Sequence, residues 1–324
     1  FPQLIAGPIV HHHEMMPQFR PESSDETTSQ RVAIGGTMFT LGLAKKVLIA
    51  DTFAELATPT FDLAATGATP AMSLAWIGVL AYTLQIYFDF SGYSDMAIGL
   101  ARLFGIRLPA NFASPYQSRS ISEFWRRWHM TLSRFLRDYL YIPLGGNRRG
   151  PARRYLNLTL TMLLGGLWHG AGWTFVAWGG LHGAYLVIHH AWERFRPLPL
   201  PGPVAQAITL AGVMLAWIFF RAVDFESAAR MLSALVGGGG SVLPEVATLE
   251  NFLWIAVGFG IALWAPNSQC WLRGYRPVLE EPVDALPLRG GWRPTPVHAM
   301  LVAALFIFSV MRITRYSEFI YFQF

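Results

Sequence analysis

The stretch that decides the fold is Leu156–Trp192, which reads LNLTLTMLLGGLWHGAGWTFVAWGGLHGAYLVIHHAW. Its 37 residues contain no charged side chain apart from histidine. A helix needs about 20 apolar residues to cross the hydrocarbon core of a bilayer, so this run is long enough for nearly two crossings. Inside it, His169 and His182 each lie between a bulky apolar residue and a glycine. An ionisable side chain at membrane depth is costly, so both histidines are candidates for a functional site.

The composition supports a membrane protein. Of the 324 residues, 53% are hydrophobic and 14% are charged, whereas soluble domains carry about 25% charged residues. The single cysteine, Cys270, excludes an internal disulfide and a cysteine-based metal cluster. The sequence contains no GxGxxG, P-loop, GxSxG or HExxH motif, so nucleotide-binding, serine-hydrolase and zincin functions lack support. The net charge of +5 is modest, and we do not expect nucleic acid as a partner.

Further apolar runs predict helices at Val32–Phe53, Met72–Phe88, Val204–Phe220 and Val297–Ile313, with a shorter run at Phe252–Trp264. Within the first run, Lys45 and Lys46 are expected to snorkel at one membrane interface. Asp89 and Asp95 follow the second run and are expected at or just inside a membrane boundary. They suit either an ion pathway or buried partners of arginines, and we favour the structural role.

These patterns predict an all-α, multi-pass transmembrane protein with re-entrant or interfacial segments. We expect one integral-membrane domain over residues 1–324. Residues 1–10 are apolar but contain Pro2, Gly7 and Pro8, which favours a re-entrant or interfacial segment over a span. The abrupt apolar start suggests the C-terminal portion of a longer chain.

Ile121–Leu144 has the pattern of an amphipathic helix on the membrane surface, with aromatic residues at helical intervals and arginines on other faces. Ser120 or Ser122 is the expected N-cap. Residues 145–154, GGNRRGPARR, hold four arginines in one short loop, which is typical of the cytoplasmic side. The central run would therefore enter from the cytoplasm. His169 would then lie about 20 Å along the helix, past the midpoint of the bilayer.

His169 is the strongest candidate for chemistry. Histidine titrates near neutral pH, which suits a general base that takes a proton from a hydroxyl attacking an acyl carbonyl. A hydrogen bond between packed helices is an equally good explanation from chemistry alone. Glycine pairs at 165–166 and 179–180 predict breaks in the run. With a break, His169 and His182 could meet in one cavity as base and orienter; in a straight helix they would lie about 20 Å apart.

Arg126, Arg127 and His129 form a basic group in the segment EFWRRWHMTLS. Taken singly, they are lipid-phosphate contacts and an interfacial histidine. Together they suit an anionic donor, such as a coenzyme or the pantetheine of a carrier protein. The histidines at 11–13 suit a polar exit from the membrane, and those at 189–190 an interfacial helix end. We predict no metal site.

Five motifs, in order along the chain, resemble the membrane-bound O-acyltransferase (MBOAT) family, and most closely its bacterial alginate O-acetylation branch. The motifs are FPQLIAGPI (1–9), YFDFSGYSDMAIGLARLFGI (87–106), SEFWRRWHMTLSRFLRDYLYIPLGGNR (122–148), GGLWHGAGWTFVAWGGLHG (165–183) and FIYFQF (319–324). The resemblance covers essentially the whole chain, although the family's amino-terminal helices are missing from it. It implies a helical, multi-pass protein of the bacterial inner membrane that moves an acyl group toward a hydroxyl.

The resemblance also implies roles for individual residues. The histidine of the family's WHG motif matches His169, the expected base or acyl relay, and its second histidine matches His182. Asn157, Trp168 and Asp89 are expected to support them. Arg126, Arg127 and His129 would then lie near the cytoplasmic entrance for the donor.

The acyl donor implied by the resemblance is acetyl-CoA, with no cofactor bound permanently. The implied partners are periplasmic SGNH-hydrolase-like proteins, which complete transfer to a polysaccharide, with alginate favoured. One alternative keeps the chemistry and transfers D-alanine from a carrier protein to teichoic acid, with the arginines of 148–154 as a docking region. A non-enzymatic alternative is a transporter or flippase that uses Asp89, Asp95 and His169 as a relay. The position of both aspartates near a boundary disfavours it.

Overall fold

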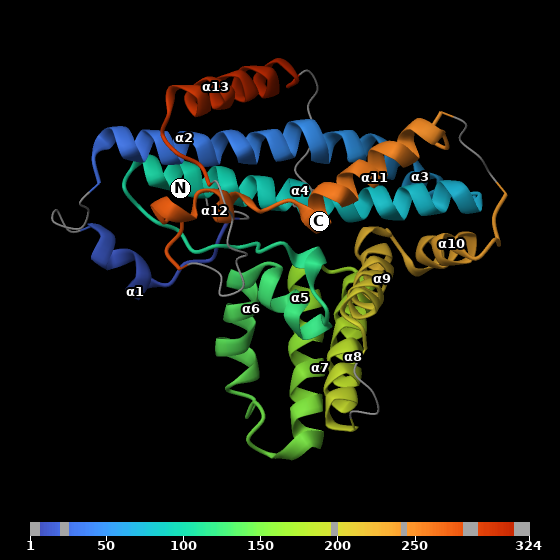
Figure 1. Cartoon of the computed structure of the whole chain (residues 1–324). Helices are drawn as coiled ribbons and strands as arrows, with labels where there is room; N and C mark the ends of the chain where they lie inside the picture. Colours follow the sequence, from blue (N-terminus) through green and yellow to red (C-terminus); the bar gives the residue numbers. More distant parts are fainter. Residues whose placement is uncertain (1–6, 20–25, 196–199, 241–244, 281–290, 314–324) are drawn as a thin grey trace.

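The computed structural model describes residues 7–19, 26–195, 200–240, 245–280 and 291–313. Every regular element in these ranges is helical, which confirms the all-α prediction. The helices α4 (Met72–Leu103) and α13 (Pro296–Met311) lie alongside α2 (Thr28–Ala44), while α7 (Gly150–His169), α8 (Trp173–Phe195) and α9 (Gly202–Arg221) run across them (Figure 1). Most of the first motif (1–6) and the whole of the last motif, FIYFQF (319–324), fall outside the described residues.

The longest helical unit joins α2 (Thr28–Ala44), a π-helical segment (Lys45–Ala50) and α3 (Asp51–Ala65) without a break. It begins at Thr27, whose side chain accepts a hydrogen bond from the Gln30 backbone. The predicted helix over 32–53 is confirmed and is longer at both ends. α4 (Met72–Leu103) packs antiparallel against this unit. A Cβ at Gly35 would lie only 2.7 Å from the Gly99 carbonyl oxygen, so glycines set the α2–α4 spacing.

Buried ion pairs join these helices. Lys45 Nζ lies 2.6 Å from Asp95, and Lys46 Nζ lies 2.7 Å from Asp89 and 2.8 Å from Asp51. The snorkelling expected of both lysines is therefore wrong, because each side chain turns inward to a carboxylate. The aspartates are buried structural partners, as favoured, but their partners are lysines rather than arginines. They lie inside α4, which continues past the predicted end of the span because both carboxylates are neutralised.

The single helix expected over 121–144 is wrong. The segment forms α5 (Ile121–Arg127), α6 (Met130–Leu136) and a π-helical turn (Arg137–Tyr141). The helix is interrupted at His129, whose backbone φ of 42° lies in the left-handed region. Asn111 holds this break: its side-chain Oδ1 lies 3.1 Å from His129 Nδ1 and accepts the Thr131 hydroxyl at 2.9 Å. Ser120 is the N-cap of α5 and accepts from Glu123 N at 3.1 Å.

The central run forms a helical hairpin of α7 (Gly150–His169) and α8 (Trp173–Phe195). A break between the histidines was expected, and it occurs at residues 170–172. The glycine pairs are not the breaks. Gly166 and Gly179 lie inside the helices, where an added Cβ would overlap the Phe175 and Met162 carbonyls of the facing helix. These glycines bring the two backbones into close contact, as small residues do between membrane helices. α7 also begins earlier than expected, with Pro151 in its first turn.

The remaining helices complete a membrane-type surface. They are α1 (His12–Met15), α9 (Gly202–Arg221), α10 (Phe225–Leu235), α11 (Leu249–Trp264), α12 (Ser268–Trp271) and α13 (Pro296–Met311), with 3₁₀ turns at Met16–Phe19, Pro115–Gln117 and Arg273–Tyr275. The apolar runs predicted over 204–220 and 252–264 lie in α9 and α11, and the run predicted over 297–313 forms α13, which ends two residues earlier, at Met311.

Within the described ranges, two helices, Thr28–Ala65 and Gly202–Arg221, are long and apolar enough to cross a membrane. α11 and α13 are shorter apolar helices of 16 residues each. Their outward faces carry large exposed apolar side chains: Leu253, Trp254, Val257, Ile261, Met300, Leu301, Ile307 and Phe308. Exposed apolar surface of this extent is typical of contact with lipid.

Candidate active site

His182 lies in the middle of α8 and is fully buried among aromatic rings. Its ring centroid is 5.1 Å from Trp125 of α5 and 4.9 Å from Trp178, one helical turn earlier on α8. Trp125 Nε1 donates a hydrogen bond to His182 Nδ1 at 3.3 Å. Trp217 of α9 contributes a further wall at 6.3 Å. Residues from three helices, α5 (Ile121–Arg127), α8 and α9, therefore meet at this histidine.

His169 is the last residue of α7 and is partly exposed at the hairpin turn. Its ring lies edge-on against Trp178 at 5.2 Å and against Phe220 of α9 at 5.1 Å. Trp178 thus contacts both His169 and His182. The hairpin brings the two predicted histidines to one aromatic cluster, although 13 residues separate them in sequence.

Some polar atoms inside this cluster have no hydrogen-bond partner in the described part of the chain. They include Nε1 of Trp178 and Nε2 of His182, both fully enclosed. A buried polar atom without a partner costs roughly 1–3 kcal/mol, so native proteins retain few of them without a functional reason. The cluster is therefore suited to receive a polar group of a ligand.

The other predicted supporting residues differ in whether they contact the cluster. Trp168 contacts the His169 ring at 5.0 Å, and its side chain is 52% exposed at the rim of the cluster. Asn157 does not support His169, because it lies 12 residues earlier on α7, about 18 Å along the axis. Its amide instead donates to the Gly146 carbonyl at 2.9 Å and anchors the arginine-rich turn. Asp89 is held in the ion pair with Lys46 described above.

The three residues predicted near the donor entrance also differ in position. His129 is 3% exposed and packs edge-on against Phe90 at 4.7 Å, so its ring is not open to solvent. Arg126 and Arg127 do line a cavity of about 420 Å³. The cavity is also lined by Trp125, Met130, Arg134 and Arg137. Because Trp125 also donates to His182, one indole ring separates this basic cavity from the histidine cluster.

Three charges of the cavity are already paired. Arg127 meets Glu123 at 2.8 Å, Arg137 meets Asp138 at 2.7 Å, and Arg134 meets Glu14. Arg126 is exposed and enters none of the ion pairs found in the described ranges. Glu280 also lines the cavity, so Arg126 is the guanidinium most available to an anionic ligand there.

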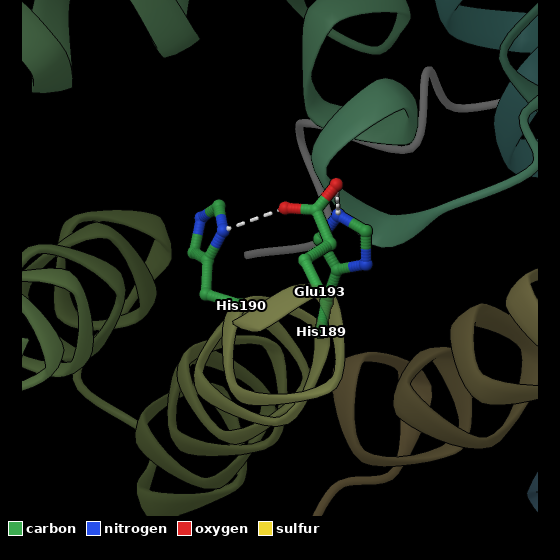
Figure 2. Close-up of side chains that lie close together, drawn as sticks. All are labelled: His189, His190 and Glu193. Carbon is green, nitrogen blue, oxygen red and sulfur yellow. Dashed lines mark hydrogen bonds and ion pairs between the residues drawn. The ribbon is translucent and has the colours of Figure 1, made fainter. Parts of the chain in front are cut away.

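A second group of titratable side chains lies near the C-terminal end of α8 (Figure 2). There Glu193 lies between two histidine rings, 3.6 Å from His189 Nε2 and 3.4 Å from His190 Nδ1. A His–His–Glu set has the composition of a metal site. Arg154 of α7 lies 3.0 Å from His190 Nδ1, however, which places a guanidinium where a cation would have to bind. We assign the group to joining the ends of α7 and α8.

Sequence reasoning found His169 and His182 but missed Trp125, Trp178 and Asn111. Trp125 and Trp178 were visible only as aromatic residues in apolar runs, and nothing in their spacing shows which face a histidine. Asn111 lies in a polar, turn-rich segment whose partners, His129 and Thr131, are 18 and 20 residues away. Long-range contacts of this kind leave no periodic signal.

Comparison with known proteins gives a consistent set of relatives. The model of the membrane-bound O-acyltransferase family, MBOAT, matches residues 1–224. A peptidoglycan O-acetyltransferase of Helicobacter pylori is 52% identical over 244 residues, which cover 74% of this chain and 46% of that protein. A protein of Pseudomonas putida named "Probable alginate O-acetylase AlgI" is 42% identical over 336 residues, covering 100% of this chain and 67% of that protein.

A more distant relative is a teichoic acid D-alanyltransferase of Streptococcus thermophilus, 36% identical over 162 residues. The match covers 48% of this chain and 39% of that protein. The chain thus spans between about two fifths and two thirds of the length of these three relatives.

Proposed function

The chain belongs to the membrane-bound O-acyltransferase family, and from that premise we propose that it transfers acetyl groups across the inner membrane of a bacterium for O-acetylation of an exopolysaccharide, with alginate as the favoured polymer. The observation that carries the proposal is the cluster in which His169 and His182 contact the same buried indole. In this cluster, a histidine at a helix end lies close to enclosed polar atoms that have no hydrogen-bond partner among the described residues. The polymer is inferred from relatives named for alginate.

In the proposed reaction, His169 acts as the general base. It takes the proton from an acceptor hydroxyl as the hydroxyl oxygen attacks the carbonyl carbon of an acetyl thioester. The carbon–sulfur bond then breaks, and the departing thiolate receives the proton from His169. A base in this position contributes about 10²–10⁴-fold to such a rate. His169 lies at the hairpin turn with intermediate exposure, and its Nδ1 is buried against the neighbouring rings.

The basic cavity supports acetyl-CoA as the donor. Arg126 and Arg127, both predicted for this role, line it together with two further arginines. The phosphate groups of the coenzyme suit guanidinium partners, which form paired and charge-assisted hydrogen bonds. The thioester end would then reach the histidine cluster past Trp125. The acceptors in this proposal are periplasmic SGNH-hydrolase-like proteins, which complete transfer to the polysaccharide.

The protein is membrane-integral, and we propose that it crosses the inner membrane several times. The support is the pair of helices long enough to span, together with the apolar faces of α11 and α13. The arginines near the start of α7 favour a cytoplasmic position for that end of the hairpin. His169 lies at the other end of α7, about 30 Å away along the helix axis.

The test is the amount of acetyl ester on the exported polymer in cells with and without the gene. We expect the polymer to lose its ester-linked acetyl on deletion and to regain it on complementation. A transporter would instead lower the amount of exported polymer and leave acetyl per sugar residue unchanged. That result would overturn the proposal.

Two relatives favour other acceptors for the same chemistry. The Helicobacter pylori relative is named for peptidoglycan and has the higher identity of the two acetyltransferases compared above. The Streptococcus thermophilus relative is named for D-alanyl transfer to teichoic acid. Analysis of peptidoglycan for O-acetyl groups, and of the envelope for labelled D-alanine, in the same deletion strain distinguishes these acceptors from alginate.

A further inference from the structure

The hydrogen bond between Trp125 and His182 determines where the histidine carries its proton. An indole N–H is a donor only, so Nδ1 of His182 must supply a lone pair to it. In a neutral imidazole the proton then resides on the other nitrogen, Nε2. With one nitrogen accepting and the other protonated, His182 has no lone pair left with which to act as a base.

The proton on Nε2 needs a hydrogen-bond acceptor, because Nε2 is fully enclosed and has no partner within the described ranges. The neighbouring Trp178 presents a second indole N–H in the same condition. The two rings lie 4.9 Å apart with an interplanar angle of 67°. The cluster therefore holds two neighbouring donors and requires an acceptor, which in an acyl transfer is the carbonyl oxygen that becomes negative in the transition state.

We propose that Trp125 is a positioning residue that holds His182 with its proton on Nε2, and that this N–H, beside that of Trp178, binds the acyl carbonyl oxygen while His169 handles the proton. The inference rests on the proposed function and deepens it. It replaces the expected role of His182 as a base or orienter with that of a hydrogen-bond donor. It also connects the basic cavity to the chemistry, because Trp125 forms part of the cavity wall.

The first experiment separates a donor from a base at His182. In glutamine the side-chain amide reaches the place of Nε2 and can donate there, but it cannot act as a base. We expect His182→Gln, in the full-length protein in its own host, to retain polymer acetylation within about tenfold of the natural protein. His182→Phe should lose about 10²–10³-fold, the usual effect of removing one such donor. Equal loss in both variants at equal membrane levels would show that His182 is a base.

The second experiment tests Trp125. Trp125→Phe keeps the aromatic ring and removes the N–H, so we expect acetylation to fall about three- to tenfold, the worth of one hydrogen bond. The matched control is Trp76→Phe. Trp76 Nε1 donates to the Leu235 carbonyl at 3.2 Å, outside the cluster, so this variant loses a comparable bond and should keep full activity.

A spectroscopic measurement reads the tautomer directly. The protein is labelled with ¹⁵N-histidine in lipid vesicles, and the His182 signals are assigned by their loss in His182→Gln. The natural protein and Trp76→Phe should show protonated Nε2 and unprotonated Nδ1, whereas Trp125→Phe should show a mixture. Protonated Nδ1 in the natural protein, or no change in Trp125→Phe, would overturn the positioning role. Because this result does not depend on acetylation, it stands apart from any failure of the proposed function.

Discussion

At the scale of single residues, the buried charge of Arg102 explains why an acidic residue stands just before α2. Arg102 is 1% exposed, and its guanidinium lies 2.7 Å from Glu26, which Arg107 also contacts at 2.7 Å. Burial raises the pKa of Glu26, but the hydrogen bonds and charges of the two arginines outweigh it and lower the pKa below its ordinary value of 4.5.

This pair predicts a loss of stability in acid. Since folding lowers the pKa of Glu26, the pair stabilises the protein above pH 4.5, and the contribution is lost as the pH falls through the lower folded pKa. We expect Glu26→Gln to lose about 1–3 kcal/mol at pH 7 and to be less sensitive to acid than the natural protein. Thermal unfolding in detergent between pH 7 and pH 3 measures both effects. Glu245→Gln, at an exposed position, is the control and should match the natural protein at every pH.

Some residues of the site could be predicted from the sequence and others could not, depending on whether their role rests on local sequence or on distant contacts. His169 and His182 were visible because a titratable group in an apolar run is costly and therefore rare. The hydrogen bond that gives His182 its role was not, because it joins side chains 57 residues apart. His129 was placed at an entrance on the strength of its basic neighbours. Its left-handed backbone and its bond to Asn111 bury it instead.

At the scale of elements, the hairpin depends on glycines at the α7–α8 contact. Gly179 faces the Met162 backbone so closely that no side chain fits, whereas a Cβ at the adjacent Gly180 would meet only Leu163 at 3.5 Å. We therefore expect Gly179→Ala to destabilise the protein by about 1–3 kcal/mol and to lower acetylation by moving Trp178. Gly180→Ala should be tolerated. Unfolding in detergent and polymer acetylation, measured on both variants, decide the point; equal effects would contradict the packing described for the hairpin.

A second prediction concerns the ion pair between the π-helical segment and α4. Lys46→Met leaves the Asp89 carboxylate buried without its ammonium, which costs about 3–5 kcal/mol. Adding Asp89→Leu removes the buried isolated charge, while Asp51, which also loses its ammonium, is partly exposed to solvent. We therefore expect the double variant to recover most of the stability and to keep acetylation. A double-variant protein that is stable but inactive would instead assign Asp89 to the chemistry, as the relay alternative requires. Thermal unfolding together with polymer acetylation provides the comparison.

The elements themselves were predictable where one pattern persists. The apolar runs that became α2, α4, α9, α11 and α13 were recognised, and the break in the central run was expected. The aromatic and basic periodicity over 121–144 predicted one surface helix, but tertiary hydrogen bonds from Asn111 divide it. Periodicity records which faces are apolar, and it does not record a break stabilised by a distant side chain.

At the scale of the whole molecule, the site lies where two groups of helices meet. The long helices α2, α3 and α4 form one group, and α7, α8 and α9 run across it with α5 and α6 beside the junction (Figure 1). Trp125 comes from α5, His169 from α7, His182 from α8 and Trp217 from α9. The cluster therefore depends on the packing of the whole assembly. The basic cavity opens beside it, between α5 and α6.

The central claim is that this cluster transfers an acyl group with His169 as the base. The most direct test is ester-linked acetyl on the exported polymer in cells that carry His169→Ala in the full-length protein. Protein levels in the membrane must match those of the natural protein, and His190→Ala, on the same hairpin but outside the cluster, is the control. We predict at least about a hundredfold loss of polymer acetylation for His169→Ala and none for the control. Normal acetylation in correctly inserted His169→Ala protein would contradict the account.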